Sequence, residues 1–225
     1  MKTLIIIAHP DISESNSQQF LIESTQSLQG VTSYILEDRA YILKEEHKLL
    51  AEHERIIFQF PMYWYSAPAI LKKWLDEVFT NKMMTGFLNE KELGLVVTMG
   101  QSEESFASGR QEKFSLSEIF KPFEALANKC GMVYLPIFPV ALFSYLNESD
   151  KKKMLIKYQQ YVTKENKETF ISEESWFMDR LRLLVEQKIG SEKLRLETVL
   201  EAMEENRDNL DELLYLVKEM RYEDD

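Results

Sequence analysis

The run TLIIIA at residues 3–8 constrains the fold more than any other stretch of this sequence. After Thr3 every side chain in it is apolar, and three of its six residues are isoleucines. A strand with one face in water alternates polar and apolar residues, whereas a strand covered by helices on both faces is apolar throughout. We therefore interpret the N-terminus MKTLIIIAHP as a buried first strand rather than as a signal peptide.

Four more strand-like runs follow, with helical patterns between them. The runs are residues 31–37, 55–60, 92–99 and 132–138, and the helical patterns are residues 15–28, 44–53, 67–79, 116–130 and 149–162, the last with Ser149 as its N-cap. Strands that alternate with helices form parallel sheets covered on both faces. We predict an α/β, flavodoxin-like five-stranded parallel sheet, for which the fold-level expectation is the order 2-1-3-4-5.

The pattern changes after about residue 167. Residues 173–189 and 191–222 are long amphipathic segments separated by Gly190, which predicts a helical hairpin. We divide the chain into an α/β domain at residues 1–167 and a C-terminal helical extension at residues 168–225. The apolar faces of the extension leave three roles open, which are docking of a partner, packing within a homodimer and a lid over a bound ligand.

The composition disfavours several classes of function. The formal net charge of −11 argues against nucleic acid and anionic membranes as partners, and no apolar run approaches the roughly 20 residues of a membrane span. The single cysteine, Cys130, which we interpret as a core residue, allows no intrachain disulfide and fits a cytoplasmic location. The three histidines and Cys130 have no metal-binding spacing, so we predict no metal site.

Three loops follow predicted strands at the edge of the sheet where ligands of such folds bind, the carboxyl ends of the strands. The first, residues 9–18, places Ser15, Ser17 and Gln18 at the start of a helix, an arrangement suited to a phosphate. Simple helix capping by Ser15 or Ser17 is the alternative. The loop lacks the GxxxxGK[ST] and GxGxxG patterns, which disfavours a nucleoside triphosphatase or a dinucleotide-binding domain.

The second and third loops add a flat apolar surface and a glycine. Residues 61–67 read PMYWYSA, with Pro68 next, and could form a wall for a planar ligand, or core and oligomer contacts instead. Residues 98–105 read TMGQSEES, where Gly100 allows close backbone approach or an ordinary turn.

Together these pieces resemble the flavin-dependent NAD(P)H:quinone oxidoreductases of flavodoxin-like fold, which include the ancillary oxidoreductases of bacterial potassium efflux and, more distantly, the DT-diaphorases. The matching stretches are AHP with the Ser- and Asn-rich loop, PMYWYSAPAILKKWLDEVF, TMG and CGMVYLPIF, within residues 1–165. The resemblance implies three groups of cofactor-binding residues. They are His9, Ser15, Ser17 and Gln18 for the phosphate and ribityl chain, Pro61, Met62, Tyr63, Trp64 and Tyr65 along one side of the ring, and Thr98, Met99 and Gly100 at its other edge.

The sequence also departs from the family pattern. Gln101 stands where the family usually has a second glycine, which puts in doubt how closely residues 98–101 approach the ring. The Tyr and His that assist hydride transfer in the DT-diaphorases have no clear counterpart after Gly100, so we name no catalytic side chain and catalysis would rest on the flavin and the backbone.

The resemblance implies a homodimeric enzyme. It would carry FMN, with FAD as the alternative, and would pass two electrons from NAD(P)H to a quinone-like acceptor in ping-pong fashion. An ancillary subunit of a transport system, docking through the helical extension, is the competing hypothesis. A flavodoxin-type electron carrier is a third, which the lack of a Ser/Thr-Gly-rich phosphate loop disfavours.

Overall fold

The computed structural model describes residues 1–80, 86–165 and 169–223, with side chains described up to residue 220. The chain divides into two compact units, Met1–Thr163 and Lys164–Asp225, which we describe separately. The predicted domain boundary between residues 167 and 168 lies outside the described residues.

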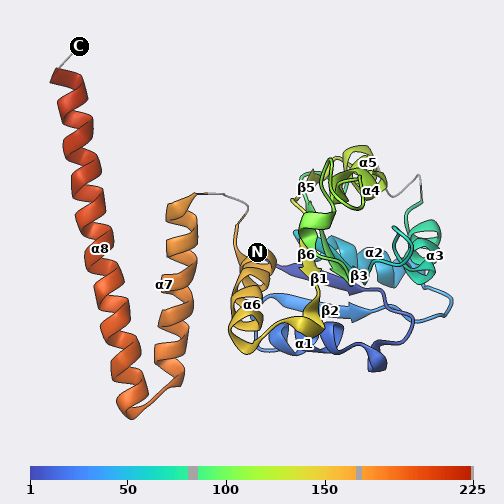
Figure 1. Ribbon diagram of the computed structural model, residues 1–225, viewed down its shortest axis with the longest axis horizontal. Helices are drawn as coiled ribbons and strands as arrows, with labels where there is room; N and C mark the ends of the chain where they lie inside the picture. Colours follow the sequence, from blue (N-terminus) through green and yellow to red (C-terminus); the bar gives the residue numbers. More distant parts are fainter. Residues whose placement is uncertain (81–85, 166–168, 224–225) are drawn as a thin grey trace. The chain divides into compact units, whose positions relative to one another are not determined.

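The first unit is built on one parallel sheet (Figure 1). Its strands are β1 (Thr3–Ile7), β2 (Val31–Ile35), β3 (Arg55–Pro61), β4 (Glu92–Met99), β5 (Val133–Tyr134) and β6 (Phe138–Ala141). The order is β2-β1-β3-β4-β5, and β6 pairs with β4 beyond β5. The predicted fold and strand order are therefore confirmed. All residues of β1 and β3 are buried, as the apolar runs require.

Helices cover both faces of this sheet. On one face, α1 (Asn16–Thr25) and α6 (Glu148–Thr163) pack with Leu21, Tyr158 and Val162 against the sheet. On the other face lie α2 (Leu43–Ala51), α3 (Ala69–Val78) and α5 (Lys121–Cys130). Shorter helices complete the unit, namely η1 (Ile12–Glu14), η2 (Glu103–Ser105), η3 (Phe143–Tyr145) and α4 (Leu116–Ile119). The Cys130 thiol is buried in the core, which raises its pKa.

The predicted fifth strand at residues 132–138 is wrong in its extent, because it is two strands separated by residues 135–137. Pro136 has no N–H to donate to a ladder, and a tyrosine from α6 fills the interruption. The Tyr161 hydroxyl donates to the carbonyl of Pro136 at 2.8 Å and accepts from the N–H of Leu95 at 3.1 Å. The second segment then continues the pairing with β4 as far as Ala141.

Two helix predictions are corrected as well. The predicted helix at residues 116–130 is two helices, because the backbone leaves the helical conformation at Phe120 before α5 begins at Lys121, with Pro122 in its first turn. The predicted N-cap of α6, Ser149, lies inside the helix. The side chain of Asn147 accepts from the N–H of Asp150 at 3.0 Å instead, so Asn147 is the cap.

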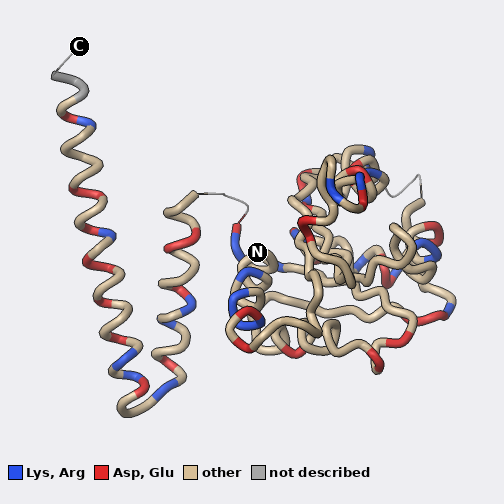
Figure 2. Tube along the Cα trace, viewed as in Figure 1, with Lys and Arg blue, Asp and Glu red and all other residues tan. Residues whose placement is uncertain are grey.

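The second unit is a helical hairpin of α7 (Phe170–Gln187) and α8 (Gly190–Glu223). Acidic and basic residues are interspersed along both helices (Figure 2). Arg182 pairs with Glu204 at 2.7 Å, and Arg207 pairs with Glu174, so ion pairs join the two helices. None of the described helices is both long and apolar enough to cross a membrane.

The Tyr161 side chain leaves no room for a methyl group at Gly94 in β4, which predicts a loss of stability when one is added. A Cβ added at Gly94 would overlap the hydroxyl oxygen of Tyr161 and lie 3.0 Å from its ring carbon Cζ. We expect Gly94→Ala to lower the free energy of unfolding by about 1–3 kcal/mol, the usual cost of overpacking. Chemical denaturation measures this. Gly100→Ala is the control, since a Cβ there would meet no atom within 4 Å, and equal stability of the two variants would contradict the role of Tyr161.

Candidate functional site

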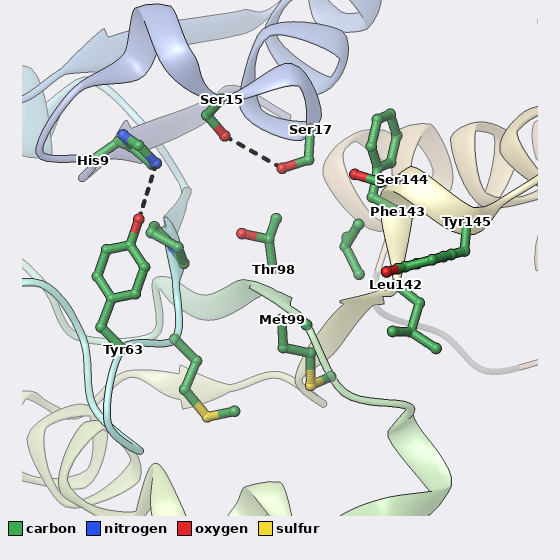
Figure 3. A pocket seen from close by; sticks show the side chains of 14 residues that line it. His9, Ser15, Ser17, Tyr63, Thr98, Met99, Leu142, Phe143, Ser144 and Tyr145 are labelled. Carbon is green, nitrogen blue, oxygen red and sulfur yellow. Dashed lines mark hydrogen bonds between the residues drawn. The ribbon is translucent and has the colours of Figure 1, made fainter.

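A cavity of about 260 Å³ opens at the carboxyl ends of the strands. Four loops contribute to it, those after β1, β3, β4 and β6 (Figure 3). The lining residues are His9, Ser15, Ser17, Pro61, Met62, Tyr63, Thr98, Met99, Gly100, Val140, Leu142, Phe143, Ser144 and Tyr145. The three loops predicted from the sequence therefore meet at one place, and a fourth joins them.

The loop after β1 brings a helix N-terminus to the cavity. Ser15 is the N-cap of α1, and its hydroxyl accepts from the N–H of Gln18 at 3.4 Å. The hydroxyls of Ser15 and Ser17 are 3.3 Å apart, and both line the cavity. Capping and ligand binding are therefore compatible here, because the N–H groups of the first helical turn have no partner within the helix. This end of the cavity can hold an anion.

His9 and Tyr63 form a pair across the mouth of the cavity (Figure 3). The N–H of Asp11 donates to His9 Nδ1 at 3.0 Å, which leaves the ring proton on Nε2. His9 Nε2 lies 3.4 Å from the hydroxyl of Tyr63 and donates to it. Burial lowers the pKa of His9 and outweighs the opposing effect of the Asp11 contact. Since the Tyr63 oxygen accepts from His9, its own proton can be donated into the cavity.

The loop after β3 makes a tight turn whose tip is not among the residues that line the cavity. Tyr63 and Ser66 exchange two backbone hydrogen bonds of 3.0 Å. Between them Trp64 and Tyr65 have φ values of 49° and 61°, a left-handed backbone that costs about 1 kcal/mol or more for each such residue. Trp64 is 94% exposed, and the Tyr65 hydroxyl donates to Glu112 at 2.8 Å. Neither residue lines the cavity, and their contact with a cofactor stays a prediction.

Thr98, Met99 and Gly100 form the floor of the cavity at the end of β4. Gln18 lies beneath this floor rather than in the lining. It is fully buried, and its side-chain amide donates to the Thr98 hydroxyl at 3.3 Å. Gln18 therefore acts on the cavity through Thr98.

The sequence reasoning missed the loop after β6. Val140, Leu142, Phe143, Ser144 and Tyr145 form one wall of the cavity. The predicted strand ended at residue 138, so these residues fell in the connection to the next predicted helix rather than at the edge of the sheet. The expected strand order 2-1-3-4-5 was the signal that could have found them. In that order the fifth strand lies beside the fourth, so the loop after it reaches the same edge of the sheet.

The chemistry of the lining suits a ligand with an anionic end and a planar body. No Asp or Glu occurs among the fourteen lining residues, so nothing in the lining repels an anion at the start of α1. Proline, methionine and tyrosine side chains supply apolar contact, while Tyr63 and Thr98 supply hydroxyls. Among the described residues there is no group of three His, Cys, Asp or Glu side chains that could hold a metal ion.

Comparisons with known proteins identify the family to which this fold belongs. Residues 1–162 match a family described by its flavodoxin-like fold. The NAD(P)H oxidoreductase YrkL of Bacillus subtilis is 35% identical over 174 residues, which cover 74% of this chain and all of that protein. The potassium-efflux system ancillary protein KefG of Serratia proteamaculans is 34% identical over 142 residues, which cover 60% of this chain and 78% of that protein.

Solved structures give the same result. An NADPH-quinone reductase from P. pentosaceus is 46% identical, with a TM-score of 0.70, over 72% of this chain and 98% of its own. General stress protein 14 of Treponema denticola, solved in complex with FMN, is 28% identical, with a TM-score of 0.65, over 72% of this chain and 98% of its own.

The environment of His9 predicts how it titrates. Because the folded protein holds the neutral ring, His9 should titrate below the ordinary pKa of 6.5 in an NMR titration, with His9→Asn used to assign the signal. The unfolded chain binds this proton more tightly, so the contribution of His9 to stability is present above pH 6.5 and declines as the pH falls toward the folded-state pKa. A midpoint at or above 6.5 would contradict the neutral pairing of His9 with Asp11 and Tyr63.

Proposed function

The chain belongs to the family of proteins with the flavodoxin-like fold, and from that premise we propose that it is an FMN-dependent NAD(P)H oxidoreductase that reduces quinones or similar acceptors. One observation carries the proposal. A helix N-terminus that can hold a phosphate and an apolar wall that can hold a flat ring line the same cavity at the carboxyl edge of the sheet. The FMN complex of the Treponema denticola relative and the NADPH-quinone reductase from P. pentosaceus support the choice of cofactor and reaction.

Different groups of residues in the cavity bind different parts of the cofactor. Ser15, Ser17 and the first-turn N–H groups of α1 hold the phosphate, with His9 beside them. Pro61, Met62 and Tyr63 contact one side of the ring, and the floor formed by Thr98, Met99 and Gly100 contacts its other edge. FMN, when bound, supplies the chemistry, since it takes two electrons with a hydride from NAD(P)H and passes them to the acceptor.

The protein's part in the reaction is to position, to donate hydrogen bonds and to exclude water. The Tyr63 hydroxyl, fixed by His9, donates into the cavity beside the ring. The backbone N–H groups of Met62, Tyr63 and Ser66 are used within the described structure. The N–H groups of Trp64 and Tyr65 make no hydrogen bond to a described residue, and they are the donors that this loop can offer to negative charge on the ring. No side-chain base is required.

A ping-pong order and a homodimer belong to the same proposal. Nicotinamide and quinone use the same cavity in turn. Trp64, which is exposed and follows the lining residue Tyr63, is suited to contact with a second copy of the chain, which would cover the cavity. We also propose a cytoplasmic location, with which the buried free thiol of Cys130 is compatible.

A second candidate is an ancillary role in a transport system, as the name of KefG implies for that relative. The observation that favours it is the α7–α8 hairpin, which begins after the family match ends at residue 162. A segment that the catalytic fold does not require is available for a partner.

The activity is tested with the purified full-length chain. We expect a yellow protein that oxidises NADH or NADPH when a soluble benzoquinone is present, with parallel lines in double-reciprocal plots because the two substrates use the site in turn. A colourless protein that FMN cannot reconstitute would overturn the proposal. Intersecting lines would reject the ping-pong order while leaving the cofactor assignment intact.

The phosphate site predicts a difference between two ligands. Ser17→Glu places a carboxylate at the start of α1, where it would repel the phosphate of FMN. We expect the Kd for FMN to rise about tenfold or more, whereas the Kd for riboflavin, which has no phosphate, should change little. Fluorescence quenching of the two flavins measures both constants. The control is Ser27→Glu, on the exposed surface beyond the other end of α1. Equal losses for FMN and riboflavin would place the phosphate elsewhere.

A further inference from the structure

A chain of three buried hydrogen bonds runs from α6 to the floor of the cavity. The Tyr158 hydroxyl donates to Gln59 Oε1 at 2.6 Å. Gln59 Nε2 donates to Gln18 Oε1 at 2.8 Å, and Gln18 Nε2 donates to Thr98 Oγ1 at 3.3 Å. Tyr158, Gln18 and Gln59 are fully buried and Thr98 nearly so. The chain thus joins α6, β3, α1 and β4, and it ends on a hydroxyl that lines the cavity.

The length of the first bond sets the direction of all three. A separation of 2.6 Å suits an O–H donor, whereas amide N–H donors lie near 2.9–3.0 Å from their acceptors. The atom of Gln59 that faces Tyr158 is therefore its oxygen, so its nitrogen faces Gln18. Because the nitrogen of Gln59 donates to Gln18, the atom of Gln18 that faces Gln59 is its oxygen. The nitrogen of Gln18 therefore faces Thr98. Burial raises the pKa of Tyr158, which keeps its phenol protonated as the fixed donor at the head of the chain.

The direction has a consequence at the cavity. Because the Thr98 oxygen accepts from Gln18, the hydroxyl proton of Thr98 is turned away from Gln18 and can be donated to a ligand. Without a fixed donor at Tyr158, the two amides could turn over, and Thr98 could then donate to Gln18 and offer the ligand only a lone pair.

We propose that Tyr158 is a positioning residue that acts through Gln59 and Gln18 to hold the Thr98 hydroxyl as a hydrogen-bond donor to the flavin ring. The inference rests on the proposed function, because it takes the ligand to be FMN. The reduced ring carries more negative charge than the oxidised ring, so a fixed donor stabilises the reduced ring more and raises the reduction potential of the bound cofactor.

The alternative is that this chain only satisfies polar groups that happen to be buried. Burying two amides costs free energy unless every polar atom is hydrogen-bonded, and apolar side chains in the same place would carry no such cost. The surrounding residues on this face of the sheet, Ile5, Ile7, Ile57 and Val96, are aliphatic. Thr3 and Arg55, the buried polar side chains at the opposite ends of β1 and β3, bond to main-chain carbonyls of α6, whereas the row that contains Gln59 leads to the cavity.

A double-mutant cycle tests the proposal. Tyr158→Phe, Thr98→Val and the double variant are titrated with FMN, and the reduction potential of bound FMN is measured for each. We expect each single variant to raise the Kd for FMN by roughly five- to tenfold, the loss of one hydrogen bond, and to lower the potential. The double variant should be no worse than Thr98→Val alone, because Tyr158 acts only through Thr98. Thr98→Ser should restore both quantities.

Two further variants separate this role from folding. Tyr161→Phe removes another hydroxyl of α6, one that bonds to Leu95 and Pro136 outside the chain. It should lower the Tm without changing the Kd or the potential. Gln18→Leu cuts the chain next to Thr98 and should match Tyr158→Phe, which supplies the test if Tyr158→Phe does not fold.

The outcomes are distinct. Wild-type protein that does not bind FMN would overturn the proposed function and this inference together. Wild-type protein that binds FMN, with unchanged Kd and potential in the Thr98 and Gln18 variants, would overturn this inference alone. Additive losses in the double variant, or equal losses in Tyr161→Phe, would reduce Tyr158 to a structural residue and reject the proposal.

Discussion

The site depends on backbone pairing that continues one residue beyond the ends of the parallel strands. The N–H of Ala8 donates to the carbonyl of Gln59 at 2.9 Å, that of Met62 to Thr98 at 2.9 Å, and that of Leu142 to Met99 at 3.0 Å. Because the strands are parallel, these three bonds lie at the same edge of the sheet. They fix the starts of the loops after β1, β3 and β6 against the neighbouring strands, so the cavity is set by the rigid part of the fold.

Two tyrosines of α6 connect that helix to the sheet with different effects. Tyr161 bonds to Leu95 and Pro136 at the break between β5 and β6. Tyr158 fixes the row of amides that ends at Thr98. One helix turn thus serves both the break in the last strand and the floor of the cavity, although neither tyrosine is among the residues that line it.

Much of the fold could be predicted from the sequence, because the pattern of apolar and polar residues within each strand and helix determines it. Apolar runs such as residues 3–8 can only be central strands, and their alternation with helices leaves few topologies. The break between β5 and β6 has a local signal in Pro136, whereas the contact of Tyr161 with the break could not be predicted, because Tyr161 is distant in sequence. At the site, the polar residues after β1 and β4 could be predicted, because they directly follow predicted strands. The exposure of Trp64 could not be, since it follows from the left-handed backbone of a tight turn.

The central claim is that the cavity holds a flavin with its phosphate at the start of α1. The most direct measurement is the mass of any chromophore released by heating the pure, full-length protein, with its molar ratio to the chain. We predict FMN at a ratio approaching one per chain, or reconstitution to that ratio when FMN is added. Release of FAD would correct the cofactor. Protein that carries no flavin and cannot be reconstituted with one would contradict the account.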